Sequence, residues 1–330
     1  MTSRNALALA GGALLLLLVL PMHAATPASI SAAAVNKAGN LPVLTASAHR
    51  SAAVARAQIL LDRAHFSPGE IDGRFGATMR GAIAAFNGAQ GLKDGARVGA
   101  ATWKALNRDS APAIVPYTLT ASDVAGPFTR IPEETADKAK LPVLGYESVT
   151  EALGEKFHVS PSLLAALNPK AKFNRAGAVI QVPAVVREAL AKTDGMSVRV
   201  SRRAGMVEAL AADGTVIARY PATTGSEHDP LPLGEWKING VARNPTFNYN
   251  PDLFWDAEAG EKKVKLAAGP NNPVGVVWID LSKPHYGIHG TPVPSAIGKT
   301  SSHGCIRLTN WDALELATIV TPGMAAVLVE

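Results

Sequence analysis

Two short stretches decide how the C-terminal part of this chain is interpreted: YGIHGT at residues 286–291 and SSHGCIRL at residues 301–308. The second contains Cys305, the single cysteine of the 330-residue chain. A single cysteine cannot form an internal disulfide, so Cys305 is either a buried apolar filler or a reactive thiol. A thiol becomes a good nucleophile when a base takes its proton and a nearby cation stabilises the thiolate. His289 and His303 are available bases, and Arg307 supplies positive charge.

The residues around Cys305 favour nucleophilic chemistry over metal binding. Gly304 lets backbone N–H groups approach a substrate carbonyl closely, as an oxyanion hole requires. A zinc site built from His285, His289, His303 and Cys305 has suitable ligand types. However, His303 and Cys305 stand only two positions apart, which is not typical ligand spacing. We therefore predict no metal and no other cofactor.

The sequence around these motifs predicts a mainly β domain. Asp213-Gly214 lies between two strand patterns and is typical of a hairpin. Thr309 and Asp312 have the spacing of a helix cap. The strand patterns cover residues 197–200, 206–210, 215–220, 235–238, 275–281 and 325–329.

Residues 196–330 resemble the catalytic domain of the L,D-transpeptidase family. Its signature is a His-Gly or His-Ser pair and a later Ser-His-Gly-Cys, followed by an apolar residue and Arg or Asn. These stand here as His289-Gly290 and as residues 302–307. Thr224-Gly225, Pro232 with Gly234, and Asn272-Pro273 with Gly275 also match. The resemblance implies an enzyme with a mixed sheet.

The resemblance also implies roles for the matched residues. Cys305 would be the nucleophile and His289 the base that ionises it. The carbonyl of Gly290 would orient the imidazole. Backbone N–H groups of His303, Gly304 and Cys305 would form the oxyanion hole.

Substrate binding is expected on both sides of the thiol. Arg307 would bind a substrate carboxylate as a bidentate pair, and Ser302 is counted with the substrate-binding residues. The insertion at residues 240–270 is rich in Pro and Asn, which favours a lid. We predict that Phe247, Tyr249 and Trp255 line the groove for the stem peptide; packing in the core is the alternative.

The reaction that the resemblance implies is a two-step acyl transfer. The thiolate attacks the carbonyl of the third residue of a peptidoglycan tetrapeptide stem, and the terminal D-Ala leaves. An amine of a second stem then attacks the thioester and forms a 3→3 cross-link; a lysine of an envelope protein is an alternative acceptor. With water as acceptor, the protein would be an L,D-carboxypeptidase or hydrolase. A non-catalytic wall-binding scaffold is the remaining alternative.

Residues 46–108 form a predicted helical module. Apolar residues recur at helical spacing around residues 54–61 and 79–86, with glycine turns at 71–76 and 93–95. The module resembles the small peptidoglycan-binding module found beside many cell-wall enzymes, although Asn87 replaces the usual Gln. The matches are Asp72, Gly73, Phe75, Gly76, Phe86, Gly91, Leu92, Asp94, Gly95 and Thr102.

A second small module is predicted at residues 143–184, after a proline-containing linker at 109–142. Two capped helical patterns and a closing strand at 178–183 give an α+β unit that resembles a lysin motif, a glycan-binding fold. A plain helical linker domain is the alternative. We thus expect a multidomain chain with an all-α N-terminal module, an α+β middle module and a mainly β, mixed-sheet catalytic domain.

The N-terminal residues predict export. Arg4 precedes the uncharged apolar run Ala6 to Leu20, and small residues follow, so residues 1–24 fit a signal peptide and 25–45 a tether. The run is short for a membrane span, so no stable membrane insertion is expected after cleavage; a retained anchor is the alternative. The net charge of +5 favours acidic partners, but no Lys/Arg run marks a nucleic-acid site. We expect a periplasmic or cell-envelope protein whose partners are peptidoglycan stem peptides and glycan strands.

Overall fold

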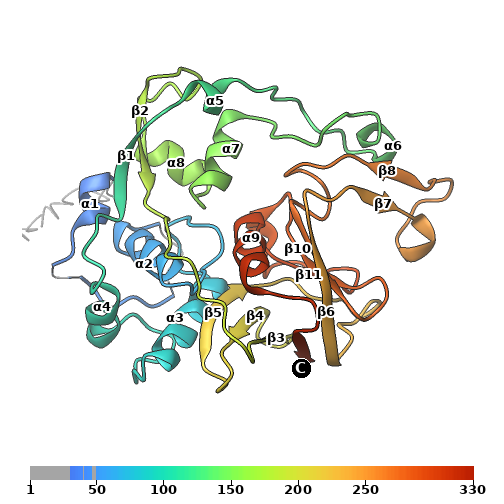
Figure 1. The fold of residues 1–330 in the computed structure, drawn as a ribbon. Helices are drawn as coiled ribbons and strands as arrows, with labels where there is room; N and C mark the ends of the chain where they lie inside the picture. The colour runs from blue at the N-terminus through green and yellow to red at the C-terminus, as the bar shows by residue number, and fades with distance from the viewer. Residues whose placement is uncertain (1–29, 40, 47–49) are drawn as a thin grey trace, which may run out of the picture.

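The computed structural model describes residues 30–39, 41–46 and 50–330. The predicted signal peptide at 1–24 lies outside the described residues, as do the first residues of the predicted tether. Within the described ranges, no helix is both long and apolar enough to cross a membrane. Figure 1 shows the N-terminal helices at the left, the middle module above them, and the C-terminal sheet toward the lower right.

The N-terminal module is helical, as predicted. Ser51 caps the first of its main helices by accepting a hydrogen bond from the Val54 N–H at 3.1 Å. In the turn that follows, Asp72 Oδ1 accepts from the Arg74 N–H at 2.8 Å, and Gly73 has a φ of +74°, which favours glycine. The main helices are α2 (Ala52–Arg63), α3 (Ala77–Ala89) and α4 (Ala100–Leu106).

Part of the predicted tether packs onto this module instead of standing apart from it. Helix α1 (Ala32–Asn36) buries Val35, and the Asn36 amide exchanges hydrogen bonds with the backbone of Ile114 at 2.9 and 2.8 Å. Leu44 is also buried. The Ala- and Ser-rich composition concealed this packing because only a few apolar side chains anchor the segment, and their partners are distant in sequence.

The middle module has the two predicted helices and the predicted closing strand, but it opens with a strand and two further short helices in the predicted linker. Strand β1 (Ile114–Thr118) pairs antiparallel with β2 (Val179–Pro183). Pro116 hides β1 from pattern analysis, because proline is tolerated only at a strand edge. The helices of this part are α5 (Ala121–Val124), α6 (Thr135–Lys138), α7 (Val149–Lys156) and α8 (Pro161–Leu167).

The N-terminal and middle modules share one hydrophobic core. Ile59 of α2 belongs to the same buried cluster as Leu153 of α7 and Leu163 of α8. The Ile71 N–H donates to the carbonyl of His158 at 2.8 Å, which joins the two modules by backbone as well. We infer that these modules unfold together, because neither can keep its core without the other.

The C-terminal domain is built on a mixed sheet, as predicted. Among the described residues, eight strands follow the order β11-β10-β9-β6-β12-β3-β4-β5, and β10–β11 and β12–β3 are parallel pairs. Helix α9 (Asn310–Ile319), capped by Thr309, packs on this sheet. The strands are β3 (Ser197–Ser201), β4 (Met206–Leu210), β5 (Val216–Pro221), β6 (Gly234–Arg243), β9 (Val277–Leu281), β10 (Gly287–His289), β11 (Ile306–Arg307) and β12 (Ala325–Val329).

An insertion between β6 and β9 projects from the sheet, at the right of Figure 1. Its strands β7 (Phe247–Tyr249) and β8 (Val264–Leu266) form an antiparallel hairpin, with the short 3₁₀ helix η1 (Pro251–Leu253) between them. A second 3₁₀ helix, η2 (Pro294–Ala296), follows β10. The hairpin is separate from the main sheet, so its aromatic residues are not part of the sheet core.

A buried cluster of charges joins all three parts of the chain. Arg187 forms ion pairs with Asp62 of α2 and with Asp312 and Glu315 of α9, and its side chain is 8% exposed. His158 of the middle module contacts Asp62 at 3.0 Å. Buried carboxylates are tolerated only when they are paired, so this cluster ties the modules to the C-terminal domain.

A cavity of about 540 Å³ lies where the middle module meets the C-terminal domain, and its lining includes Glu70, Glu133, Glu151 and Glu155. Glu155 of α7 accepts a hydrogen bond from the Asn310 amide at 3.1 Å. Burial raises the pKa of Glu155 to about 8, and the charges of Glu151 and Glu70 act in the same direction. The junction therefore holds a proton on Glu155 at neutral pH.

This proton makes the stability of the junction depend on pH. The carboxyl in an unfolded chain has its ordinary pKa of 4.5, so between about pH 4.5 and 8 the folded state binds a proton that the unfolded state has lost. Stability from this group is therefore lost as pH rises through that window. We expect Glu155→Gln to melt at the same temperature as the wild type at pH 5 and at a higher temperature at pH 8. Glu133→Gln, an exposed carboxylate at the same cavity, should leave both melting temperatures unchanged; parallel shifts of wild type and Glu155→Gln would contradict this account.

Candidate active site

Two parallel strands bring His289 and Cys305 to the same edge of the sheet. His289 ends β10 and pairs with Arg307 of β11, while Ile288 pairs with Ile306. This register sets Cys305, just before β11, opposite the start of β10. Two short strands are enough to position these side chains, because the backbone hydrogen bonds between the strands fix which residues lie opposite each other.

The imidazole of His289 is buried and held in one tautomer. Its ring is 3% exposed and stacks on Trp278 of β9, with centroids 5.6 Å apart. Nδ1 lies 2.7 Å from the carbonyl oxygen of Gly290. A carbonyl can only accept, so Nδ1 carries the hydrogen and Nε2 keeps its lone pair. Burial lowers the pKa of His289 to about 4, which keeps the ring neutral at physiological pH.

The thiol of Cys305 is half-buried and protonated in this state. Burial raises its pKa, while the Gly287 N–H and the charge of Arg307 act in the opposite direction. The thiol donates to the backbone carbonyl of His285, with Sγ and O 3.6 Å apart. The structure therefore places a neutral thiol and a neutral imidazole on adjacent strands, and the thiol hydrogen bond runs to His285 rather than to His289.

Two glycines shape the backbone beside these groups. Gly304 has a φ of +91°, and a Cβ there would lie 2.7 Å from the Tyr286 ring. A Cβ on Gly290 would collide with the side-chain oxygen of Asn310. Glycine is thus required at both positions by backbone angle or by space.

The remaining motif residues surround the thiol in different ways. Arg307 is half-buried, and its Nη1 donates to the Ser301 carbonyl at 3.4 Å. Ser302 is 3% exposed and its hydroxyl donates to the Cys305 carbonyl at 2.5 Å. The structure therefore places Ser302 as a brace inside the loop and not on a substrate-facing surface, because a buried hydroxyl needs a partner. The side chain of His303 turns outward to Asp256 of the insertion, 2.8 Å away.

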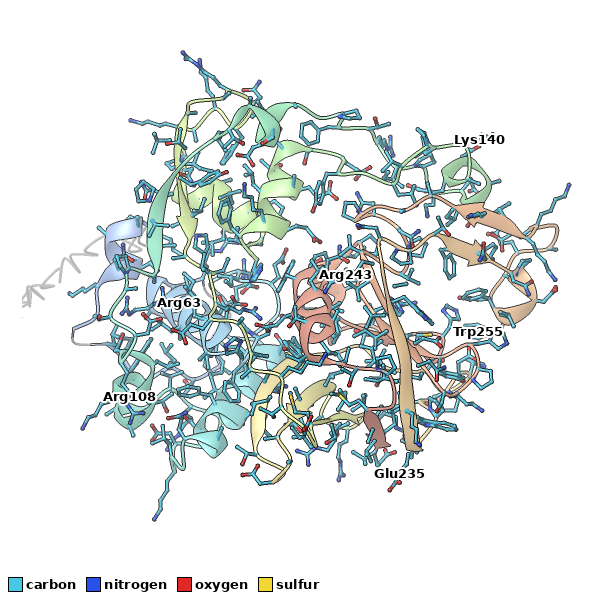
Figure 2. The ribbon with its side chains drawn as sticks, in the orientation of Figure 1. Arg63, Arg108, Lys140, Glu235, Arg243 and Trp255 are labelled. Atoms are coloured by element: carbon cyan, nitrogen blue, oxygen red, sulfur yellow. The ribbon has the colours of Figure 1, made fainter. Side chains whose placement is uncertain are left out.

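The insertion aromatics lie near the site but not all equally close to it. The ring of Trp255 is 6.0 Å from that of His303 and stacks on His228 at 4.2 Å, and Figure 2 shows Trp255 on the insertion side of the molecule. Tyr249 stacks on Phe254, whose ring in turn meets His303. Phe247, on the same hairpin, lies one ring further out, 6.5 Å from Tyr249. None of the predicted three is in the sheet core, and Trp255 is 57% exposed.

Some residues at the site were not singled out from the sequence. Tyr286 packs against Gly304, and Asp256 binds His303. Asp229 acts electrostatically on Cys305. Tyr286 stood inside the first motif and could have been noticed there; Asp229 and Asp256 reach the site through loops whose closure has no local signal.

Metal ligation does not emerge from the described part of the chain, where no group of three or more His, Cys, Asp and Glu side chains could hold an ion. Two of the zinc ligands considered in the sequence analysis have other partners: Nδ1 of His289 is hydrogen-bonded to a carbonyl, and Nε2 of His303 to a carboxylate. The arrangement suits proton transfer between imidazole and thiol.

Comparison with known proteins points the same way. Residues 197–329 match the family model of the L,D-transpeptidase catalytic domain, and residues 50–106 match that of a putative peptidoglycan binding domain. Neither range includes residues 143–184, so a lysin motif there stays a prediction.

Among curated proteins, the putative L,D-transpeptidase YkuD of Bacillus subtilis is 37% identical over 114 residues, which are 34% of this chain and 54% of that protein. Its counterpart in Bacillus licheniformis is 40% identical over 108 residues, 33% of this chain and 50% of that protein. The chain thus spans about half the length of these relatives. A crystal structure of L,D-transpeptidase 3 from Mycobacterium tuberculosis is similar at a TM-score of 0.35 and 17% identity, over 47% of this chain and 76% of that one.

Proposed function

We propose that the chain forms 3→3 cross-links between peptidoglycan stem peptides, with Cys305 as nucleophile and His289 as base, since residues 197–329 match the L,D-transpeptidase catalytic domain. One observation carries this proposal: the buried His289 ring is fixed through Nδ1, on the strand next to the one that follows Cys305, with Nε2 left as a proton acceptor. A base must be neutral and held near its nucleophile before it can act.

The acylation step begins from a neutral pair. The low pKa of His289 and the raised pKa of Cys305 both disfavour a resting ion pair, so the proton moves as the thiol attacks. The sulfur attacks the carbonyl of the third stem residue. His289 passes the proton to the nitrogen of the departing D-Ala, and a thioester on Cys305 remains.

The negative charge that develops on the substrate carbonyl oxygen is proposed to be stabilised by the loop around Cys305. The backbone N–H groups of His303, Gly304 and Cys305 are the proposed oxyanion hole, and the positive φ of Gly304 supports this assignment. The Arg307 guanidinium is proposed to bind the substrate carboxylate. Ser302 contributes by holding the Cys305 carbonyl, which fixes the loop that carries these donors.

The second step transfers the acyl group to an amine. A side-chain amine of another stem is the proposed acceptor, with a lysine of an envelope protein as the alternative. The peptidoglycan-binding match at residues 50–106 supports a role at the wall, because a domain that binds the polymer raises the local concentration of stems. We accordingly place the protein in the cell envelope, exported to the periplasm.

Intact-protein mass spectrometry tests the proposal. The chain is mixed with disaccharide-tetrapeptide, beside a Cys305→Ala control. We expect an acyl adduct on the wild type only, with loss of D-Ala, and then a 3→3 dimer. D-Ala release with tripeptide and no dimer would identify a hydrolase. The absence of both adduct and release would overturn the enzymatic proposal in favour of a wall-binding scaffold.

The insertion is proposed to act as a lid over the donor stem. Tyr249 supports Phe254, which contacts His303, so its removal should loosen the lid. An aromatic pair contributes about 0.5–1.5 kcal/mol, so Tyr249→Ala is expected to raise KM for the stem about 2- to 10-fold in steady-state assays. Tyr249→Phe keeps the stacked ring and loses only the hydrogen bond from its hydroxyl to Glu261, so it should raise KM less than Tyr249→Ala. Unchanged KM and kcat in Tyr249→Ala would show that the lid idea is wrong.

A further inference from the structure

The loop after β5 brings a carboxylate to the thiol. Thr223, at its start, exchanges backbone hydrogen bonds with Arg307 of β11 at 3.0 and 2.9 Å, so the loop begins beside the strand that follows Cys305. Within the loop, the Ser226 N–H donates to the Asp229 carbonyl at 2.8 Å, and the Ser226 hydroxyl accepts from the Asp229 N–H at 3.0 Å. Backbone contacts therefore hold Asp229 in place, and its side chain is not needed for the loop conformation.

The side chain of Asp229 is left without a partner. Its Oδ2 atom is buried and has no hydrogen bond among the described residues. A buried carboxylate oxygen without a partner costs about 1–3 kcal/mol or more. Such groups in native structures call for a reason, and functional sites are where sequences tolerate this cost. Oδ2 is closed to solvent, so a ligand reaches this half-buried carboxylate at its other oxygen, Oδ1. A cation bound there would offset the cost of burying the negative charge.

The loop that carries Asp229 lies near the place where the acyl bond is made and broken: the neighbouring His228 stacks on Trp255 at 4.2 Å, and the Trp255 ring lies 6.0 Å from that of His303. Its charge raises the pKa of the Cys305 thiol and of the Tyr286 hydroxyl, so the carboxylate lies within electrostatic reach of both. Arg307 acts on the thiol in the opposite sense. The sulfur thus lies in the combined field of one cation and one anion, which suits a substrate pair that brings a carboxylate and an ammonium.

The substrate ammonium would take part in the second step of the reaction, the transfer to the acceptor. A side-chain amine has an ordinary pKa near 10.4, so an acceptor reaches the enzyme as an ammonium. It must place its nitrogen about 3–3.5 Å from the thioester carbonyl, which is bonded to the Cys305 sulfur. A carboxylate in reach of that sulfur is therefore in the region where the attacking nitrogen arrives.

We propose that Asp229 binds the ammonium group of the acyl acceptor, a primary amine on a peptide side chain, and holds its nitrogen next to the thioester on Cys305. The inference rests on the proposed function and adds to it the residue that selects an amine over water. The ammonium releases one proton to solvent, and the neutral nitrogen attacks the carbonyl carbon. The C–N bond forms and the C–S bond breaks. His289 takes the second proton from nitrogen and returns it to the Cys305 sulfur.

The test separates transfer from acylation in the full chain carrying Asp229→Asn. Disaccharide-tetrapeptide serves as both donor and acceptor, and mass spectrometry follows the thioester, the 3→3 dimer and the hydrolysed tripeptide. We expect acylation within about twofold of the wild type. A hydrogen bond to a charged group contributes enough to lower the ratio of dimer to tripeptide by about 10- to 100-fold. Glu227→Gln, which removes an exposed carboxylate from the same loop, should leave that ratio unchanged.

A neutral acceptor provides the second measurement. Hydroxylamine is uncharged at neutral pH, so its attack on the thioester should be equally fast in Asp229→Asn and in the wild type. A dimer-to-tripeptide ratio equal to that of the wild type would overturn the role of Asp229. So would an acylation rate that falls as far as transfer, or an equal loss with hydroxylamine, since these indicate a donor-binding or folding defect. If the wild type forms no thioester on Cys305, the proposed function and this inference both fail.

Discussion

Replacing His289 with Gln is expected to slow acylation of Cys305 by about 10²- to 10⁴-fold, the contribution of a positioned proton acceptor. Glutamine can form hydrogen bonds in the buried space beside Trp278, but it cannot take the thiol proton. Single-turnover mass spectrometry with the tetrapeptide substrate measures this rate directly. His285→Asn is the matched control: it removes an exposed imidazole, keeps the carbonyl that accepts from Cys305, and suits the φ of +68° at that position.

The pH dependence of acylation follows from the same ring. His289 has a pKa of about 4, so it loses its role as base only as pH falls toward that value. The raised pKa of Cys305 keeps the thiol protonated to alkaline pH. We expect a rate that is flat from about pH 5 to 8. A rate that instead rises with an apparent pKa near that of an ordinary histidine, about 6.5, would contradict a buried neutral base.

Replacing Arg187 with Met is expected to lower the free energy of unfolding by about 3–5 kcal/mol, because it leaves buried carboxylates without their cation. Asp62 and Asp312 are both fully buried, and burial already raises the pKa of Asp312 to about 6. The lost pairing spans α2 and α9, so the effect should appear in the unfolding of the whole chain. Urea denaturation at pH 7 measures it.

Arg203→Met is the control for this prediction, since Arg203 is an exposed arginine on the C-terminal domain. It should change stability by less than about 0.5 kcal/mol. A similarly small change in Arg187→Met would show that the cluster does not hold the modules together. Because Arg187 does not touch the site, the folded variant should acylate at the wild-type rate.

The shared core limits how the N-terminal and middle modules can move relative to the C-terminal domain. The N-terminal and middle modules share a core, and the charge cluster ties them to α9. They are therefore not free to move on a flexible linker as separate binding units would be. A glycan strand held by the N-terminal module would lie in a fixed orientation relative to Cys305.

The sequence was sufficient to predict the features that depend on a few neighbouring residues. The two motifs predicted His289 as the base for Cys305 through the resemblance to the family whose signature they carry, and the structure pairs the strands at these motifs in parallel. Helical spacing of apolar residues and glycine turns predicted the N-terminal module for the same reason: a local period or a positive φ is a property of a few neighbouring residues. Strand β1 was not predicted, because Pro116 interrupts the local strand pattern. The strand is stabilised by pairing with β2, which is distant in sequence.

What the sequence by itself determined is thus the chemistry and the elements: a lone cysteine with a base, a cation and glycines, on a mainly β domain behind a helical module. Only the tertiary structure decided how these parts meet. It turned His303 toward Asp256, buried Ser302, and brought Asp229 within electrostatic reach of the thiol. It also assembled the Arg187 cluster. Contacts of this kind depend on charges and burial between residues far apart in the chain, and such pairs leave no periodic or local pattern to detect.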